Sequence, residues 1–206
     1  MHSFTEHEGL VGVLPRDDVD TDQIIPKQFL ARTGRDGYQD GCFFAWRLDP
    51  TGQPRADFEL NHPAFLGHSV LVAGRNFGCG SSREHAAWAL LDSGVRVVVA
   101  PSFGDIFTVN ALQNGLVPVT LEPAMVATLM ARGQRRDGYR VTVDLVRQEV
   151  RDDEGLRAGF AVDPFWRACL LEGRDPIAMA LDQEAAIAAH EAERSRLLPV
   201  TTGLDR

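Results

Sequence analysis

Residues 69–94 constrain the fold of this chain more strongly than any other stretch. The apolar run 70–73 opens the stretch, glycines follow at positions 74, 78 and 80, and Gly94 closes an amphipathic segment. A short apolar run of this kind is typical of a parallel strand that is covered on both faces. Glycines let the backbone turn tightly and approach a ligand without a Cβ atom in the way. We therefore predict a buried strand, a glycine-rich loop and a helix that ends at Gly94.

The beginning of this predicted helix carries the groups of an anion site. Ser81 and Glu84 have the spacing of a capping box, which predicts that the helix begins directly after Ser81. Free backbone N–H groups, the hydroxyls of Ser81 and Ser82 and the cation of Arg83 would then meet at one helix N-terminus. The glycine spacing fits neither a dinucleotide site nor a P-loop, so a carboxylate or phosphate is the better ligand. From the residues alone, a second interpretation stays open: Ser81 only caps the helix, and Arg83 faces solvent.

A regular alternation of strands and helices follows the glycine-rich loop. Ser102 and Asp105 repeat the capping-box spacing, and Pro118 predicts an edge or a bulge in its strand. The alternation implies a parallel, right-handed core, in which the loops 74–82 and 101–105 leave the carboxyl ends of strands and share one rim. The predicted elements are strands at 95–100 and 116–121, helices at 102–114 and 123–132, an alternating strand at 139–145 and a hairpin at 148–162.

Two aspartate–proline pairs mark further helix starts. Asp163–Pro164 and Asp175–Pro176 each combine an N-cap residue with proline at the first helical position. The last helix is predicted to run to about Arg196, with apolar residues on one side and charged residues on the other. Such a helix could pack on this chain or on a partner.

The composition limits the classes of function. A formal net charge of −8 argues against binding of nucleic acid or of an anionic membrane surface. The chain has no apolar run of membrane-spanning length and no secretion signal, so neither a span nor export is predicted. Cys42, Cys79 and Cys169 have no paired spacing, which indicates a reducing compartment, and we expect a cytoplasmic protein. No metal or iron–sulfur spacing is present, so no metal site and no bound cofactor are predicted on this chain.

The acidic segment that precedes residue 23 imitates the start of a calcium loop. Asp18, Asp20 and Asp22 have the right spacing, but Gln23 replaces the glycine at the sixth position and Phe29 replaces the glutamate at the twelfth. We reject calcium for this reason. A solvated turn and an active-site loop both remain open for this segment.

Two side chains of the glycine-rich loop are candidates for reactivity. A thiol beside a helix N-terminus has a lowered pKa, but His85 lies within the following helix and is no obvious base for Cys79. We therefore interpret Cys79 as a close-packing residue. Ser81 could act as a base only if loop amides and an arginine stabilised its alkoxide, because a hydroxyl is a weak base near pH 7. The sequence places such groups beside Ser81.

Three motifs resemble the small subunits of 3-isopropylmalate dehydratase, which belong to the aconitase superfamily. These motifs are residues 20–30 (DTDQIIPKQFL), 76–85 (NFGCGSSREH) and 100–107 (APSFGDIF). The resemblance extends to 169–173 and 187–192, so it covers nearly the whole chain. The string GSSREH in this setting is the most specific part of it.

The resemblance implies a fold, a partner and a reaction. The implied fold is α/β, a swivelling β/β/α domain like the last domain of aconitase, over residues 1–172, with residues 173–206 as a C-terminal helical extension. A separate large subunit would carry a [4Fe-4S] cluster, and the substrate would be a hydroxy-diacid. The implied reaction interconverts 2-isopropylmalate and 3-isopropylmalate through isopropylmaleate by removing and re-adding water.

The resemblance also assigns roles to individual residues. Ser81 would be the base that takes the Cα proton, and Ser82 and Arg83 would bind the substrate carboxylates. Thr21, Asp22 and Gly80 would lie at the substrate. The stretch that resembles the family's specificity loop, which selects the isopropyl group, consists of Phe29, Leu30, Ala31, Arg32 and Thr33.

Two other functions stay open at this point. A small subunit of a related hydro-lyase would act on homoaconitate or citramalate-type acids, and the stretch 29–33 argues against it. A non-catalytic anion-binding module would be consistent with the absence of metal spacing. The chain departs from the family pattern at Ala45, where Asp is usual, and at Ala87, where Pro is common, but neither position touches the proposed chemistry.

Overall fold

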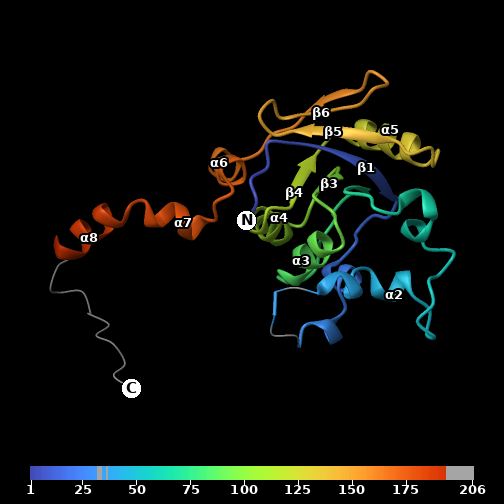
Figure 1. Cartoon of the computed structure of the whole chain (residues 1–206), viewed down its shortest axis with the longest axis horizontal. Helices are drawn as coiled ribbons and strands as arrows, with labels where there is room; N and C mark the ends of the chain where they lie inside the picture. The colour runs from blue at the N-terminus through green and yellow to red at the C-terminus, as the bar shows by residue number, and fades with distance from the viewer. Residues whose placement is uncertain (32–33, 36, 194–206) are drawn as a thin grey trace.

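One seven-stranded sheet organises the computed structural model, which describes residues 1–31, 34, 35 and 37–193 (Figure 1). The strand order is β4-β3-β2-β1-β5-β6-β7. Strands β1 to β4 pair in parallel, and β5, β6 and β7 continue the sheet in antiparallel pairing. The strands are β1 (Glu6–Leu14), β2 (Val70–Ala73), β3 (Val97–Ala100), β4 (Val117–Thr120), β5 (Arg140–Asp144), β6 (Glu149–Arg151) and β7 (Arg157–Gly159).

The parallel half of the sheet confirms most of the predicted core. The prediction of a parallel core over residues 69–146 is wrong for its last strand, because β5 pairs with β1 in antiparallel orientation. Val70 of β2 lies opposite Val11 of β1 and Val97 of β3, and every residue of β2 and β3 is buried. Strands buried on both faces read as continuous apolar runs, which is why these segments were recognisable. Pro118 lies in β4 at the end of the strand order, so the prediction of an edge strand is confirmed.

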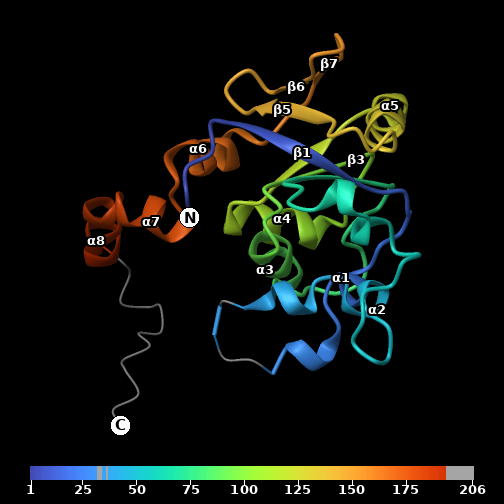
Figure 2. The same cartoon turned by 45° about the vertical axis from the view of Figure 1, so that its right-hand side comes forward.

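Helices cover both faces of this half (Figure 2). The helices α3 and α4 lie on one side of the sheet, and α5 lies on the other, where Gly133 packs closely on Val13 of β1. Gly115 ends α4 at φ 84°, as predicted. The longer helices are α3 (His85–Asp92), α4 (Asp105–Asn114), α5 (Pro123–Gly133), α6 (Pro164–Glu172), α7 (Pro176–Leu181) and α8 (Glu184–Glu193). The short ones are α1 (Thr21–Ile24), α2 (Phe44–Arg47) and the 3-10 helices η1 (Lys27–Phe29), η2 (Tyr38–Gly41), η3 (Glu59–Asn61) and η4 (Pro63–Phe65).

Both predicted capping boxes in the parallel half are wrong. The helix α3 begins at His85, and α4 begins at Asp105; neither helix has a side-chain cap. The hydroxyl of Ser81 is instead hydrogen-bonded to Thr21. Ser102 accepts the backbone N–H of Asn76. Partners from other parts of the fold therefore occupy the groups that the local spacing would have used.

The two aspartate–proline starts are confirmed, and the C-terminal helices differ from the prediction in one respect. Asp163 accepts the N–H groups of Phe165 and Trp166, and Asp175 accepts that of Ala178. The last predicted helix is two helices, α7 and α8, which project away from the body of the molecule in both views (Figures 1 and 2). Arg196 lies outside the described residues. Within the described part of the chain, no helix is long and apolar enough to cross a membrane.

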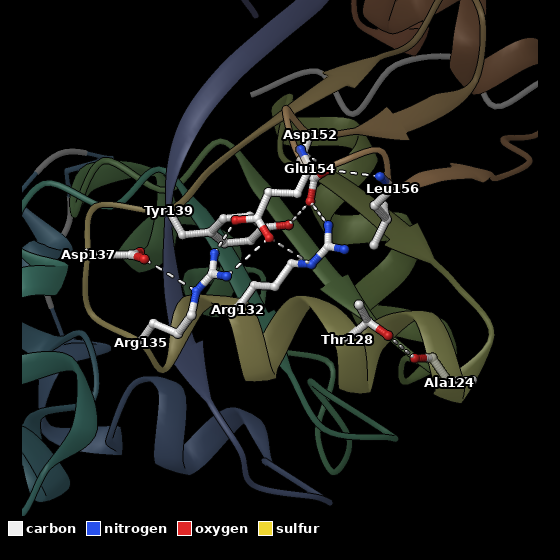
Figure 3. A network of polar contacts seen from close by, with 9 residues as sticks. All are labelled: Ala124, Thr128, Arg132, Arg135, Asp137, Tyr139, Asp152, Glu154 and Leu156. Atoms are coloured by element: carbon white, nitrogen blue, oxygen red, sulfur yellow. Dashed lines mark hydrogen bonds and ion pairs between the residues drawn. The ribbon is translucent and has the colours of Figure 1, made fainter.

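A buried carboxylate joins the end of α5 to the β6–β7 hairpin (Figure 3). Asp152 accepts hydrogen bonds from the hydroxyl of Tyr139, the guanidinium of Arg132 and the backbone N–H groups of Glu154 and Leu156. Its side chain has no exposed surface. We call these five residues the Asp152 cluster. The cluster fixes the predicted hairpin, which turns at 153–155, against the helix that follows the parallel core.

Candidate active site

The glycine-rich loop consists of residues 74–84. Its first half runs beside the acidic segment 16–22. Four backbone hydrogen bonds of 2.7–3.1 Å join the two segments. Arg75 adds ion pairs to Asp17 and Asp18, at 3.0 and 3.2 Å. The acidic segment is therefore a wall of the glycine-rich loop rather than a separate solvated turn. The backbone bonds run from Gly74 N to Arg16 O, from Asp18 N to Arg75 O, from Gly78 N to Val19 O and from Thr21 N to Cys79 O.

The second wall is the loop 101–105, so the predicted common rim is confirmed. Phe77 donates its N–H to Ser102 O at 3.0 Å, and Gly104 donates to Phe77 O at 2.9 Å. Gly78 has φ 75°, and a Cβ atom there would lie 2.2 Å from Cγ of Phe107. Only glycine fits at this position. The glycine-rich loop is consequently held from two sides, and its remaining side faces outward.

Ser81 stands where the loop leaves these two walls. Its Oγ lies 2.8 Å from Oγ1 of Thr21, and its backbone N–H donates to the same Oγ1 at 3.3 Å. Thr21 is 1% exposed, whereas Ser81 is half-buried and the neighbouring Gly80 is exposed at φ 97°. The predicted site residues Thr21, Gly80 and Ser81 thus lie together, on segments that are 60 positions apart in the sequence.

The residues after Ser81 present backbone donors. The N–H groups of Ser82, Arg83 and Glu84 have no acceptor among the residues that the structure describes. Ser82 is exposed, and α3 begins directly after these residues. Unpaired N–H groups at the start of a helix, with the helix dipole behind them, bind anions. Backbone donors of the kind that an anion site needs are therefore present, although the helix begins later than predicted, and anion binding here stays a prediction.

Arg83 carries the positive charge of this site. Its guanidinium forms an ion pair with Asp22 and is 22% exposed, whereas the Asp22 side chain is 60% exposed. The second interpretation of the sequence required Arg83 to face solvent. The ion pair with Asp22 shows that its side chain does not extend freely into solvent. The pair brings the predicted site residues Asp22 and Arg83 together and ties the Arg83 guanidinium to α1.

Two asparagines of α4 hold this part of the loop, and the sequence did not point to them. Asn110 donates to Ser82 O at 3.3 Å. The amide nitrogen of Asn114 donates to Glu84 at 2.7 Å, while its oxygen accepts the indole N–H of Trp88 at 2.9 Å. Because these contacts join residues 26–30 positions apart, no local spacing reveals them.

The two other reactive candidates are Cys79 and His85. Burial is the main reason why the pKa of the Cys79 thiol is raised, and the carboxylates of Asp20 and Asp18 raise it further. His85 packs its ring against Trp88 and Tyr38, with centroids 4.6 and 5.4 Å apart, so it does not serve as a base for Cys79. Both findings support the interpretation of Cys79 as a packing residue.

The predicted specificity stretch follows α1 closely. Phe29 packs edge-on against Phe44, with ring centroids 5.1 Å apart, Leu30 is half-buried and Ala31 is exposed. Arg32 and Thr33 lie outside the described residues. The roles of all five residues remain predictions.

No three His, Cys, Asp or Glu side chains of the described chain come together as a metal site would need. Cys42, Cys79 and Cys169 are free thiols, and Cys42 and Cys169 are buried. Burial raises the pKa of Cys42 to about 11. Iron–sulfur clusters are held by several convergent thiolates, so these three thiols do not fit a cluster.

The comparison with known proteins agrees with this geometry. A family model described as the aconitase C-terminal domain matches residues 1–124, and one described as LeuD_N matches residues 127–164. The 3-isopropylmalate dehydratase small subunit of Bacillus pumilus is 50% identical over 198 residues, which cover 96% of this chain and 99% of the relative. That of Brevibacillus brevis is also 50% identical and covers 94% of this chain and 100% of the relative.

A solved structure agrees as well. The structure of 3-isopropylmalate dehydratase (LeuD) from Methanocaldococcus jannaschii superposes with a TM-score of 0.61 at 28% identity. It covers 90% of this chain and 99% of the other. Because whole chains align, the likeness is not confined to the glycine-rich loop. The chain therefore belongs to the aconitase C-terminal domain family and, within it, to the small subunits of 3-isopropylmalate dehydratase.

Proposed function

We propose that this chain is the small subunit of a 3-isopropylmalate dehydratase that works in leucine biosynthesis. The enzyme would interconvert 2-isopropylmalate and 3-isopropylmalate through isopropylmaleate. The observation that carries the proposal is the convergence of Ser81, Arg83 and unpaired backbone N–H groups on one exposed loop. The alignment with small subunits of that enzyme over nearly the full length supports the substrate.

In the proposed chemistry, Ser81 takes the proton from Cα of the substrate. Arg83 and Ser82 bind the substrate carboxylates, since a guanidinium matches a carboxylate with two parallel hydrogen bonds. Asp22 holds Arg83 until the substrate carboxylate arrives and keeps the guanidinium at the loop. The open N–H groups of residues 82–84 supply further donors to the same anion.

The other half of the reaction is proposed to lie on a large subunit that carries a [4Fe-4S] cluster. Removal of the substrate hydroxyl is the chemistry that such a cluster supplies. The outward-facing side of the glycine-rich loop is where such a partner would complete the site. We further propose that residues 29–33 select the isopropyl group, that residues 1–172 and 173–206 form a domain and its extension, and that the protein works in the cytoplasm, where its three free thiols stay reduced.

Reconstitution tests this proposal. The chain is purified alone and together with the large subunit from its own host, and isopropylmaleate hydration is assayed for each. We expect no turnover by this chain alone, and turnover together with iron in the complex. Turnover by the isolated chain, or the absence of a complex with an iron–sulfur protein, would contradict the proposal. Homoaconitate and citramalate are assayed in parallel, because faster turnover of either would reassign the substrate.

A further inference from the structure

The hydroxyl of Thr21 makes two contacts, and both are with Ser81. It accepts the backbone N–H of Ser81 at 3.3 Å and lies 2.8 Å from Oγ of Ser81. A hydroxyl has one donor and two acceptor positions, so the first contact uses one lone pair and leaves the donor free for Ser81 Oγ. Thr21 is 1% exposed, which leaves its hydroxyl little access to a substrate on the exposed side of the loop.

Loss of the Ser81 proton decides the direction of this hydrogen bond. While Ser81 is protonated, either hydroxyl can donate to the other. Once Ser81 is an alkoxide it can only accept, and Thr21 must donate. A hydrogen bond to a charged oxygen is roughly twice as strong as one between neutral groups. The contact therefore favours the deprotonated form of Ser81 over the protonated form.

We propose that Thr21 is a positioning residue for Ser81: it aims the Ser81 hydroxyl at the open side of the loop and stabilises its alkoxide. This inference rests on the proposed function, in which Ser81 is the base. It changes the role that the family resemblance suggested for Thr21, from contact with the substrate to contact with the base. In this step the Ser81 alkoxide takes the Cα proton of the substrate. Thr21 donates a hydrogen bond and keeps its own proton.

The fold holds Thr21 in place for such a role. Thr21 is the first residue of α1, whose capping box is complete: Asp20 accepts Gln23 N at 2.8 Å, and Gln23 accepts Asp20 N at 2.9 Å. Thr21 N donates to Cys79 O at 2.9 Å, two residues before Ser81. The buried Ile24 anchors the other end of α1. Side-chain placement at catalytic groups must hold within about half an ångström, and these contacts supply that restraint.

The test uses the reconstituted complex with three variants of Thr21. Thr21→Val keeps the shape and removes the donor, Thr21→Cys keeps a weak donor, and Thr21→Ser keeps the hydroxyl. Thr128→Val is the matched control, because Thr128 donates to Ala124 O within its own helix α5 (Figure 3). The readouts are kcat, KM, the pH profile of kcat, and co-purification with the large subunit.

We expect Thr21→Val to lower kcat about 10- to 100-fold with little change in KM, which is the range of one hydrogen bond to a charged group. The limb of the pH profile on which kcat rises with increasing pH should move to higher pH by about one to two units. The reason is that loss of the donor raises the pKa of the base. The kcat of Thr21→Cys should lie between those of Thr21→Val and the wild type, and Thr21→Ser should keep most of the activity. Thr128→Val should match the wild type.

Three results would overturn the inference. These are an unchanged kcat and pH limb in Thr21→Val, a raised KM at normal kcat, and a Thr21→Ser variant as slow as Thr21→Val. If Thr21→Val does not assemble, Thr21→Cys carries the same test. Ser81→Ala is measured alongside: if it turns over normally, the proposed function itself fails, whereas an inactive Ser81→Ala beside a normal Thr21→Val removes only the role of Thr21.

Discussion

The glycine-rich loop and the Asp152 cluster are both polar and both tie distant segments together, but they differ in what they leave unpaired. The Asp152 carboxylate has no exposed surface and accepts hydrogen bonds from Tyr139, Arg132 and two backbone N–H groups (Figure 3). Residues 82–84, in contrast, leave three backbone N–H groups without an acceptor in the described chain. A closed network stabilises the fold, whereas an open one of this kind can bind a ligand.

The ionisation of the cluster agrees with a structural role. Burial on its own would raise the pKa of Asp152, but hydrogen bonds from Tyr139, the backbone and Arg132 lower it overall. Burial and the bond to Asp152 raise the pKa of Tyr139. Both groups therefore keep one ionisation state near neutral pH, and the cluster has no proton to exchange with a substrate. This contrast predicts separable effects on activity and stability.

The largest combined effect on stability and activity is expected at Gly78, where the loop meets α4. A Cβ atom there would overlap Phe107 at a backbone φ of 75°, so Gly78→Ala should cost about 2–4 kcal/mol of stability. Displacement of Ser81 should also lower kcat by roughly 100-fold or more. Denaturant unfolding and assays of the complex measure both. Gly67→Ala is the control, because Gly67 has φ 76° but open space around it. Wild-type stability of Gly78→Ala would contradict the tight packing, and a normal kcat would contradict the displacement of Ser81.

Asp152→Ala should affect stability and spare catalysis. It leaves the buried donors around residue 152 without their acceptor, so the free energy of unfolding should fall by about 3 kcal/mol. The kcat of the folded complex should stay within about twofold of the wild type, because no hydrogen bond or ion pair among the described residues joins the cluster to residues 74–84. Asp153→Ala, on the exposed neighbour, is the matched control. A large loss of kcat in Asp152→Ala would show that the cluster is not purely structural.

The pH dependence of stability should show the lowered pKa of Asp152. A carboxyl whose folded pKa lies below its unfolded value of 3.8 stabilises the protein above that value and loses the contribution as pH falls through the folded pKa. The gap between wild type and Asp152→Asn should thus be constant above about pH 5 and shrink below about pH 4. Denaturant titrations between pH 3 and 7 test this, and a gap that does not shrink would contradict it.

Arg135→Ala should give the smallest effect. Arg135 pairs with Glu154 and Asp137 at the rim of the cluster, and all three side chains are at least 40% exposed. Exposed ion pairs contribute little, since solvent screens them and the side chains lose freedom. We expect no resolvable shift of the unfolding midpoint and unchanged activity. A clear loss of stability would show that the exposed ion pairs of Arg135 also stabilise the fold.

The same contrast explains which parts of the structure were predictable from sequence. The strand at 70–73, the helix end at Gly115 and the caps at Asp163 and Asp175 depend on neighbours within a few residues, and all are confirmed. The cap at Ser81 failed because Thr21, 60 positions away, takes its hydroxyl. Local spacing describes what a group can do, and tertiary contacts decide among the options.

The position of the site was predictable for a related reason. Glycines 74, 78 and 80 mark close backbone approach, and the two loops share a rim because parallel strands end there. The contacts of Asn110 and Asn114, and the pair between Arg83 and Asp22, depend on the packing of separate segments. No periodicity or motif spacing encodes them. The sequence thus predicted the loop at which an anion would bind, but not the contacts that shape this loop.

Turnover of Ser81→Ala in the reconstituted complex tests the central claim most directly. Ser93→Ala, just beyond the other end of α3, serves as the matched serine control, and co-purification with the large subunit verifies assembly. If Ser81 is the base, kcat for isopropylmalate isomerisation should fall about 1,000-fold while the complex stays intact and Ser93→Ala remains active. A Ser81→Ala complex with kcat near that of the wild type would show that the open loop binds an anion without performing the proton transfer.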